Sequence, residues 1–259
     1  MKRIENKYYI PAAVAEEFKR RVVPFVQLDP LAHRDNPQFY TVRSIYFDTP
    51  ELDAYFEKIE GTPIRKKVRI RGYNQERENC IVILEVKRKH HRYVWKDRAP
   101  VHFTDVSELL SSGSIDEYVL GEAMHEEAAS HARRFLFHLH SQKMIALTNV
   151  VYDRTAFIGK FDPTFRLTFD FNLRYALRPK LEKLFSDDEM TRESKRDCIM
   201  EIKYFHDIPV WLRSLISEYE LQLRAISKYG LSIESLCGNG HPSVVQRENR
   251  LKARARGIY

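Results

Sequence analysis

A carboxylate followed two positions later by an ammonium occurs in three separate segments of the chain, "RIENKYYI", "IVILEVKRK" and "CIMEIKYF". The pairs are Glu5 with Lys7, Glu85 with Lys87, and Glu201 with Lys203. Since side chains alternate along a strand, both members of each pair share one face. Carboxylates bind hard divalent cations, and ammonium groups bind phosphate oxygens. The repeated motif therefore indicates chemistry on a phosphate-bearing anion, with a metal ion held by a few carboxylates.

A row of cations strengthens this interpretation. The segment "PIRKKVRIRGY" places Arg65, Lys67, Arg69 and Arg71 on one strand face. Like charges in such a row repel one another unless an anion lies among them. For any single strand, a solvated charged face with cross-strand ion pairs is the ordinary explanation. The recurrence of cationic faces on several strands favours a surface that binds a polyanion, because guanidinium groups match phosphate oxygens in a bidentate way.

The pattern of apolar residues predicts the elements that carry these side chains. Strands are expected at 3–10, 40–48, 64–73, 80–89, 92–98, 143–153, 154–159, 164–175 and 198–205, and helices at 11–22, 51–59, 105–111, 122–139, 209–219 and 227–236. Residues 186–197 are charged and are expected to form a surface loop. The helices need an apolar sheet face to pack on. If the strands close into a barrel with the helices outside, the charged faces line its lumen.

Length and charge suggest one large ordered region and a tail. The chain has 259 residues and a net charge of +7, of which the segment after residue 242 carries five cations and one glutamate. We expect one ordered domain over 1–240 and a basic, flexible tail over 241–259. The tail has one tyrosine for base stacking, so it supports unspecific electrostatic contact and no specific nucleic-acid recognition.

The cysteines, the N-terminal residues and the lack of long apolar stretches indicate the cellular compartment of the protein. Cys80, Cys198 and Cys237 form no metal-binding spacing, which fits free thiols in a reducing compartment. The N-terminus has no signal-peptide core, and no stretch approaches the roughly 20 apolar residues that cross a bilayer. We expect a cytoplasmic protein with no transmembrane segment; association with a membrane through a partner protein is left open.

Nine short motifs together resemble a known family. "ENKYYI", "VRSIYFDTP", "VRIRGY", "LEVKRK", "YDRTAF", "RLTFD", "MEIKY", "PVWL" and "SKYG" occur in this order between residues 3 and 236. The set is similar to VTC domains, the polyphosphate polymerase domains of the vacuolar transporter chaperone complex and their stand-alone bacterial relatives. These belong to the wider triphosphate tunnel metalloenzyme, or CYTH-like, superfamily. Each motif alone is weak evidence, whereas the ordered set is specific.

The resemblance implies an α+β fold: a closed antiparallel β tunnel barrel of about eight strands with helices packed outside. It implies transfer of the γ-phosphate of ATP to a growing inorganic polyphosphate chain, with Mn²⁺ or Mg²⁺ as cofactor. The residues that resemble the phosphate-binding and catalytic cations are Lys7, Arg69, Arg71, Lys87, Arg154, Arg166 and Lys228, together with Lys203. Glu201 resembles the metal-binding glutamate, with Glu5, Glu85 and Asp170 as further acidic candidates. Either Lys96 or Arg98 matches one more basic position, and the sequence does not decide between them.

One departure from the wider superfamily affects the reaction type. Tunnel triphosphatases begin with E-x-E-x-K, whereas this chain has Arg3 where the first glutamate would stand. Replacing an acid by a cation weakens a second metal site, and a second metal is one way to activate an attacking water. This favours transfer between phosphates over hydrolysis. The alternatives are a metal-dependent triphosphatase and a non-catalytic module that binds polyanions.

Overall fold

The structure is a computed structural model that describes residues 3–30, 38–91, 93–121, 125–192 and 197–236. The chain divides into two compact units, which are described separately. Unit 1 comprises Met1–Val42, Val151–Arg174 and Thr191–Ser227, and unit 2 comprises Arg43–Val150, Tyr175–Met190 and Lys228–Tyr259. The expected basic tail over 241–259 and Cys237 lie outside the described residues.

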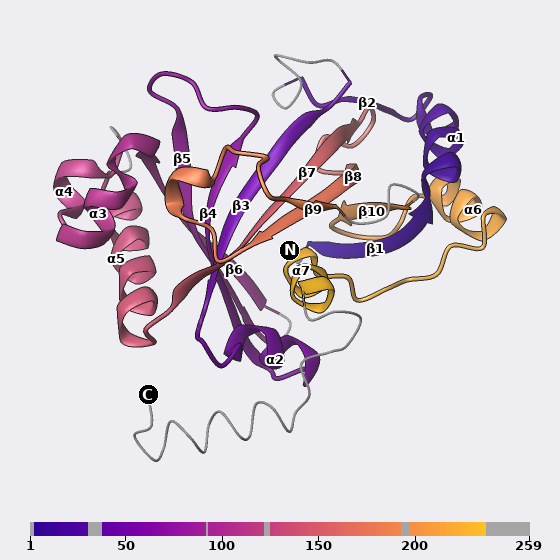
Figure 1. Cartoon of the computed structure of the whole chain (residues 1–259). Helices are drawn as coiled ribbons and strands as arrows, with labels where there is room; N and C mark the ends of the chain where they lie inside the picture. Colours follow the sequence, from indigo (N-terminus) through magenta and orange to yellow (C-terminus); the bar gives the residue numbers. More distant parts are fainter. Residues whose placement is uncertain (1–2, 31–37, 92, 122–124, 193–196, 237–259) are drawn as a thin grey trace. The chain divides into compact units, whose positions relative to one another are not determined.

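The elements follow one another along the chain as Figure 1 labels them. The strands are β1 (Ile4–Pro11), β2 (Val26–Leu28), β3 (Tyr40–Asp48), β4 (Ile64–Tyr73), β5 (Ile81–His90), β6 (Tyr93–His102), β7 (Ile145–Gly159), β8 (Arg166–Leu177), β9 (Thr191–Arg192) and β10 (Asp197–Tyr204). The α-helices are α1 (Ala12–Val22), α2 (Asp53–Ile59), α3 (Val106–Ser112), α4 (Ile115–Tyr118), α5 (His125–Ser141), α6 (Val210–Glu218) and α7 (Lys228–Leu236). Two 3₁₀ turns, η1 (Phe103–Asp105) and η2 (Leu181–Lys183), complete the set.

Hydrogen bonding connects the strands into one sheet in the order β1-β10-β8-β7-β3-β4-β5-β6, with β2 added on β7 and β9 on β8. The pairs β1–β10, β10–β8, β4–β5 and β5–β6 are all antiparallel. The α+β class predicted from the sequence is therefore confirmed.

The predicted closure of the sheet into a barrel is wrong. Among the described residues the order of paired strands ends at β1 on one side and at β6 on the other. The outer edge of β1 is bridged at Tyr8 by Leu223, and Arg224 donates its N–H to the Lys7 carbonyl at 2.9 Å. The outer edge of β6 is bridged at Val101 by Val119. A loop thus bonds to part of each edge strand and covers part of an edge that would otherwise be open to strand pairing.

The core of unit 1 lies between its apolar sheet face and two helices. Alternate residues of β1, β8 and β10 point to this face, among them Ile10, Phe169 and Met200. They pack against Phe18 of α1 and Leu212 of α6. The opposite face of the same strands carries the charged residues, as the period-two pattern predicts.

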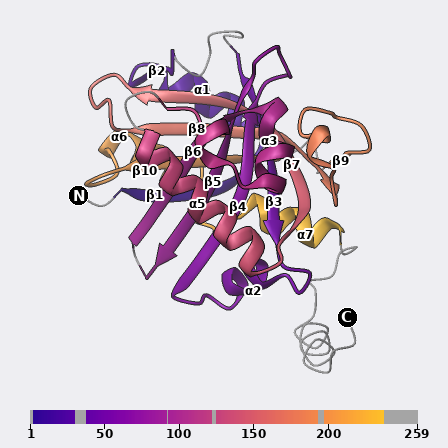
Figure 2. The same ribbon diagram turned by 90° about the vertical axis from the view of Figure 1, so that its left-hand side faces the viewer.

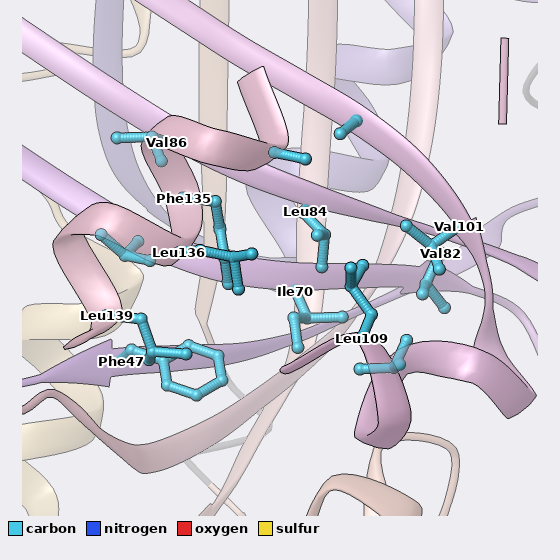
Figure 3. Packing of buried hydrophobic residues seen from close by; sticks show 14 of the residues in the cluster. Phe47, Ile70, Val82, Leu84, Val86, Val101, Leu109, Phe135, Leu136 and Leu139 are labelled. Atoms are coloured by element: carbon cyan, nitrogen blue, oxygen red, sulfur yellow. The ribbon is translucent and has the colours of Figure 1, made fainter. Parts of the chain in front are cut away.

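Unit 2 has an equivalent core of its own. Figure 3 shows Ile70, Val82, Leu84 and Val86 of the sheet packed against Phe135 and neighbouring residues of α5. Figure 2 shows β4, β5 and β6 lying side by side behind α5. The strand residues that alternate with these core positions carry the cations of β4 and β5, so the helix layer fixes which face remains charged.

The predicted elements match observed ones with bounds shifted by up to four residues, and two further differences stand out. The two strands expected over 143–159 are one continuous strand, β7. The short elements β2, β9 and α4 were not predicted, and β9 lies inside the expected loop over 186–197. Such two- to four-residue elements carry too little periodicity to be recognised.

In the described part of the chain, no helix has the length and apolar character needed to cross a membrane.

Candidate functional site

In unit 1, two of the Glu-x-Lys motifs face each other across adjacent strands. The antiparallel register of β1 and β10 places Lys7 opposite Glu201 and Glu5 opposite Lys203. Each carboxylate is thus directly across from an ammonium group of the partner strand. Opposite charges at such positions stabilise strand pairing.

The distances show that Glu201 is the centre of this group. The Glu201 carboxylate is buried, and its Oε1 atom lies 2.9 Å from Lys203 Nζ and 3.9 Å from Lys7 Nζ. Lys7 Nζ also lies 3.0 Å from Glu5 Oε1. A single ammonium group therefore contacts two carboxylates, which means that Glu5 and Glu201 converge on one cation.

Arg154 of β7 approaches the same carboxylate from the other side. Its NH2 atom lies 3.5 Å from Glu201 Oε2. The guanidinium is held by a bidentate pair of hydrogen bonds to Asp170, at 2.5 and 2.7 Å, and its CZ atom lies 5.2 Å from the centroid of the Tyr152 ring. Both oxygens of Asp170 are engaged in orienting Arg154. The metal-ligand role predicted for Asp170 stays a prediction.

Burial and neighbouring charge shift the two lysines in opposite directions. Burial alone would lower the pKa of Lys7, but Glu201 and Glu5 outweigh it and raise the pKa. Burial lowers the pKa of Lys203, and the nearby Arg154 lowers it further, against the pull of Glu201. Lys203 is therefore the ammonium group of this set that loses its proton more readily.

Arg166 contacts its own turn and is not part of this carboxylate group. It lies opposite Lys203 in the register of β8 and β10. Its guanidinium donates to the carbonyls of Pro163 and Phe165, and its Nε atom lies 3.9 Å from an oxygen of Asp29. Its predicted phosphate-binding role stays a prediction.

In unit 2, the third Glu-x-Lys motif lies between two strands that carry cations. The register of β4, β5 and β6 aligns Arg69, Glu85 and Arg98 in one row. The next row consists of Lys67, Lys87 and Lys96. These two rows hold five cations and one carboxylate, and they include both Lys96 and Arg98, between which the sequence did not decide.

Glu85 is held by arginines on both sides. One carboxylate oxygen accepts a hydrogen bond from Arg69 NH2, and the other accepts one from Arg98 Nε at 3.1 Å. Burial would raise the pKa of Glu85, but Arg69, Arg71 and Arg98 outweigh it and lower the pKa to about 2. The carboxylate is ionised at neutral pH and fixes the direction of two guanidinium groups. Its role as a metal ligand stays a prediction.

The sequence interpretation missed a polar strip on β3 next to these arginines. Tyr46 accepts a hydrogen bond from Arg69 NH1 at 2.7 Å, and the Ser44 hydroxyl accepts one from Arg71 Nε at 3.3 Å. Burial would raise the pKa of Tyr46, but Arg69 and Arg71 outweigh it and lower the pKa. The signal was available in "VRSIYFD", where Ser44 and Tyr46 alternate with the core residues Ile45 and Phe47.

Tyr229 connects this strip to the last helix of unit 2. Its ring stacks on Tyr46 with centroids 5.2 Å apart, and its hydroxyl donates to the buried carboxylate of Asp48. Asp48 also accepts hydrogen bonds from three backbone N–H groups, that of Thr49 and those of Ala54 and Tyr55 in the first turn of α2. Burial raises the pKa of Asp48 to about 6. The bond fixes the beginning of α7, where Lys228, a predicted phosphate-binding residue, precedes Tyr229.

The sequence of the chain matches the model of one known protein family. The VTC domain family model matches residues 2–237. The chain belongs to the VTC domain family. This confirms the membership predicted from the nine ordered motifs. A comparison with curated protein sequences found no significant match.

Solved structures similar to this VTC domain are distant in sequence. PH1819 from Pyrococcus horikoshii OT3 has a TM-score of 0.45 at 12% identity, with 90% of this chain and 99% of the other covered. The candidate adenylyl cyclase HpAC1 from Hippeastrum, reported to have a dominant triphosphatase activity, has a TM-score of 0.47 at 13% identity, with 89% and 94% covered. The Mediator head module of Schizosaccharomyces pombe gives 0.39 at 9% identity, with 85% and 92% covered.

The carboxylates of this VTC domain can be tested for their fit to a divalent cation. Among the described residues, no group of three or more His, Cys, Asp or Glu side chains is placed to hold a metal. Mg²⁺ is commonly bound through one or two carboxylates, with the other positions filled by water and substrate phosphates. Glu201 and Glu5 already converge on the ammonium group of Lys7 and supply hard oxygen donors. The pair therefore fits a Mg²⁺ or Mn²⁺ ion that enters together with a phosphate ligand.

Proposed function

We propose that this VTC domain is a polyphosphate polymerase that transfers the γ-phosphate of ATP to a growing inorganic polyphosphate chain. The observation that carries the proposal is the composition of the two rows in unit 2, which hold five cations and only one carboxylate. Lysines directly opposite lysines are unfavourable in a sheet without a counterion. A chain of phosphates supplies the negative charge that these rows lack, which agrees with the family to which the protein belongs.

The rows in unit 2 are suited to hold such a chain in an extended form. Glu85 orients Arg69 and Arg98, so that both present guanidinium groups in fixed positions. Lys67, Lys87 and Lys96 add mobile point charges in the next row. Arginine supplies geometric specificity for phosphate oxygens and lysine supplies charge, so the face binds a polyanion without requiring a specific end group.

The group in unit 1 is suited to hold the reacting phosphate and the cofactor. Glu201 and Glu5 would hold Mn²⁺ or Mg²⁺, which supplies charge neutralisation of phosphate oxygens when bound. Lys7 and Lys203 form ion pairs with Glu201, and their ammonium groups can turn from its carboxylate to a phosphate. Arg154 is fixed by Asp170 and remains directed at the same position. Phosphoryl transfer depends mainly on positioning and charge stabilisation, so no side-chain nucleophile is required.

Arg3 favours transfer over hydrolysis. Its pKa is lowered by burial and by the neighbouring cation Arg166, which indicates that it belongs to the same charged face. A cation at this position opposes a second metal ion beside Glu5, and so disfavours the activation of water by a second metal.

Incubation of the purified chain with ATP and MnCl₂ tests the proposal, with products separated on a polyacrylamide gel. We expect long polyphosphate that an exopolyphosphatase degrades. Release of orthophosphate without polymer would identify a triphosphatase and would overturn the proposal. Binding of polyphosphate without any turnover, at every metal and nucleotide concentration, would identify a non-catalytic polyanion-binding module. Glu201→Gln is the matched control, because it removes the charge of the central carboxylate and keeps its size.

A further inference from the structure

The ends of three strands in unit 2 form a surface, here called the strand tip, most of which lies outside the rows assigned to polyphosphate. It consists of residues 64–67 of β4, 87–90 of β5 and 93–96 of β6. The register aligns them in four rows: Ile64–His90–Tyr93, Arg65–Lys89–Val94, Lys66–Arg88–Trp95 and Lys67–Lys87–Lys96. Only the last row was assigned to polyphosphate. The Arg65–Lys89–Val94 row lies on the same face beyond it, and the other two rows lie on the opposite face.

The composition of the strand tip is strongly one-sided. Of its twelve residues, seven are Lys or Arg, one is His, four are large apolar residues, and none is acidic. Several of these cations have partners outside the tip. Lys66 Nζ lies 3.7 Å from Glu57, Arg88 forms two hydrogen bonds to Asp97 at 2.7 and 3.0 Å, and Arg65 donates to the Lys58 carbonyl at 3.5 Å. Cross-strand neighbours such as Arg65 and Lys89 carry the same sign and repel one another.

The four apolar residues of the strand tip are exposed to solvent. The exposed fractions are 67% for Ile64, 55% for Tyr93, 48% for Val94 and 45% for Trp95. The Tyr93 and Trp95 rings lie 5.9 Å apart, and the Arg88 guanidinium lies 5.8 Å from the Trp95 ring. Single exposed apolar residues are ordinary, but a contiguous group of them marks an interaction surface.

We propose that the strand tip docks on an anionic lipid surface. Clusters of four to eight Lys or Arg residues are attracted to anionic leaflets. Trp and Tyr favour the boundary between headgroups and acyl chains, because one part of each ring system is apolar and another part is polar. Free polyphosphate would satisfy the cations and leave Ile64, Tyr93 and Trp95 exposed. A lipid surface satisfies both the charge and the apolar side chains.

The arrangement of side chains supports this docking mode. Ile64, Tyr93 and Trp95 lie on one side of the strands, since they alternate with Arg65, Val94 and Lys96. Insertion of the three apolar side chains below the headgroups would bring Lys66 and Arg88 of the same side to headgroup level. The long stems of these cations allow their charged ends to reach phosphate groups.

Sedimentation with vesicles tests the proposal on the full chain. Vesicles of phosphatidylcholine with about 30% phosphatidylglycerol are compared with vesicles of phosphatidylcholine alone. We expect binding to the anionic vesicles only, weakening as salt rises from about 0.1 M to about 0.5 M. The double variant Tyr93→Ser with Trp95→Ser should lower the partition coefficient about tenfold. Phe161→Ser is the matched control, because this phenylalanine of unit 1 is 83% exposed and lies outside the strand tip.

Two results would overturn the proposal: absence of binding to anionic vesicles, or binding by the double aromatic variant equal to that of the wild type. All variants carry the same basic C-terminal tail, so a difference between them reports on the strand tip. Binding to poly-glutamate that depends on Tyr93 and Trp95 as strongly as vesicle binding does would instead indicate an acidic protein partner.

A further comparison separates the docking surface from the proposed activity. Arg69→Ala should keep the vesicle binding of the wild type and lose turnover, whereas the double aromatic variant should keep turnover and lose vesicle binding. If the protein proves not to be a polymerase, the vesicle experiment still decides the docking proposal.

Discussion

The same Glu-x-Lys motif produces opposite electrostatics in the two units. In unit 1 the motif of β1 faces the motif of β10, so that each Glu lies opposite a Lys and the charges balance. In unit 2 the motif of β5 is flanked by β4 and β6, so that Glu85 faces two arginines and Lys87 faces two lysines. The motif alone therefore does not determine which charges surround it. The residues on the neighbouring strands determine this. Balanced charge suits a metal-binding site, and surplus positive charge suits a polyanion.

The pKa shifts of Lys7 and Glu85 reflect the same difference in charge between the two units. In unit 1 two carboxylates compete with burial for Lys7 and raise its pKa. In unit 2 three arginines act on the single carboxylate of Glu85 and lower its pKa to about 2. The cations of unit 1 are already paired within the protein. The cations of unit 2 exceed the carboxylate available to them in these rows.

The largest expected effect comes from the balanced group in unit 1. Glu201→Gln removes the negative charge that lies against Lys7, Lys203 and Arg154 and should lower turnover by about a thousandfold or more. Steady-state rates with ATP at saturating MnCl₂ measure the effect, and the thermal midpoint checks the fold. Glu5→Gln should cost less, because the ion pair of Glu5 in the described part of the chain is with Lys7, whereas Glu201 lies within 4 Å of three cations. Equal, near-wild-type turnover for both variants would show that unit 1 is not the metal-binding region.

A smaller loss of activity is expected from the cationic rows of unit 2. Arg69→Ala should lower kcat/KM by about a hundredfold, because it removes a phosphate-binding group and leaves Glu85 with one partner. Arg69→Lys should recover only part of the loss, since lysine cannot make the two contacts of Arg69 to Glu85 and Tyr46 together. Full recovery by lysine would mean that charge alone matters in these rows, and that the observed geometry does not.

The pH dependence of stability tests the role of Glu85 in unit 2. The pKa of Glu85 in the folded state, about 2, is below the usual value near 4.3, so its contribution is complete above about pH 5 and is lost as pH falls. Between about pH 7 and pH 3 the wild type should lose about 1.5–2 kcal/mol more unfolding free energy than Glu85→Gln, which cannot titrate there. Urea unfolding at a series of pH values measures this difference.

A surface carboxylate provides the control for the pH experiment. Glu16→Gln alters an exposed ion pair with Lys19 on α1 and should show no such difference. Parallel stability curves for the wild type and Glu85→Gln would contradict the assignment of Glu85 as the anchor of the two arginines.

The smallest effect is expected at the connection between α7 and β3. Tyr229→Phe removes the hydroxyl bonded to Asp48 and should cost about 1 kcal/mol of unfolding free energy. It should also raise the KM for ATP a few-fold, because the preceding residue, Lys228, is then held less firmly. The cost should be greater at about pH 8 than at about pH 5, because Asp48, with a pKa of about 6, is ionised only at the higher pH. Urea unfolding at both pH values, with initial rates against ATP concentration, provides the measurements. An equal cost at both pH values would contradict the bond to the carboxylate.

The faces on which the charged residues lie could be predicted from the sequence because strand alternation is local. Period-two alternation placed Glu85 and Arg69 on a charged face and Val86 and Ile70 in the core, and the structure agrees. The ordered motifs identified the VTC family, which the match over residues 2–237 confirms. Arg166 shows the limit of this reasoning. It lies on β8 where the motif predicts, yet its guanidinium contacts the carbonyls of its own turn.

The sequence by itself determined which residues are charged, which strand face they occupy and to which family the chain belongs, because these depend on local alternation and on ordered motifs. Tertiary structure decided strand order, the open sheet and the pairing of each carboxylate. It placed Glu85 between two arginines and Glu201 among two lysines and an arginine. It also placed Tyr229 against Asp48, which lies 181 residues earlier in the chain. Such contacts depend on register and on distant segments, which alternation along a single strand does not specify.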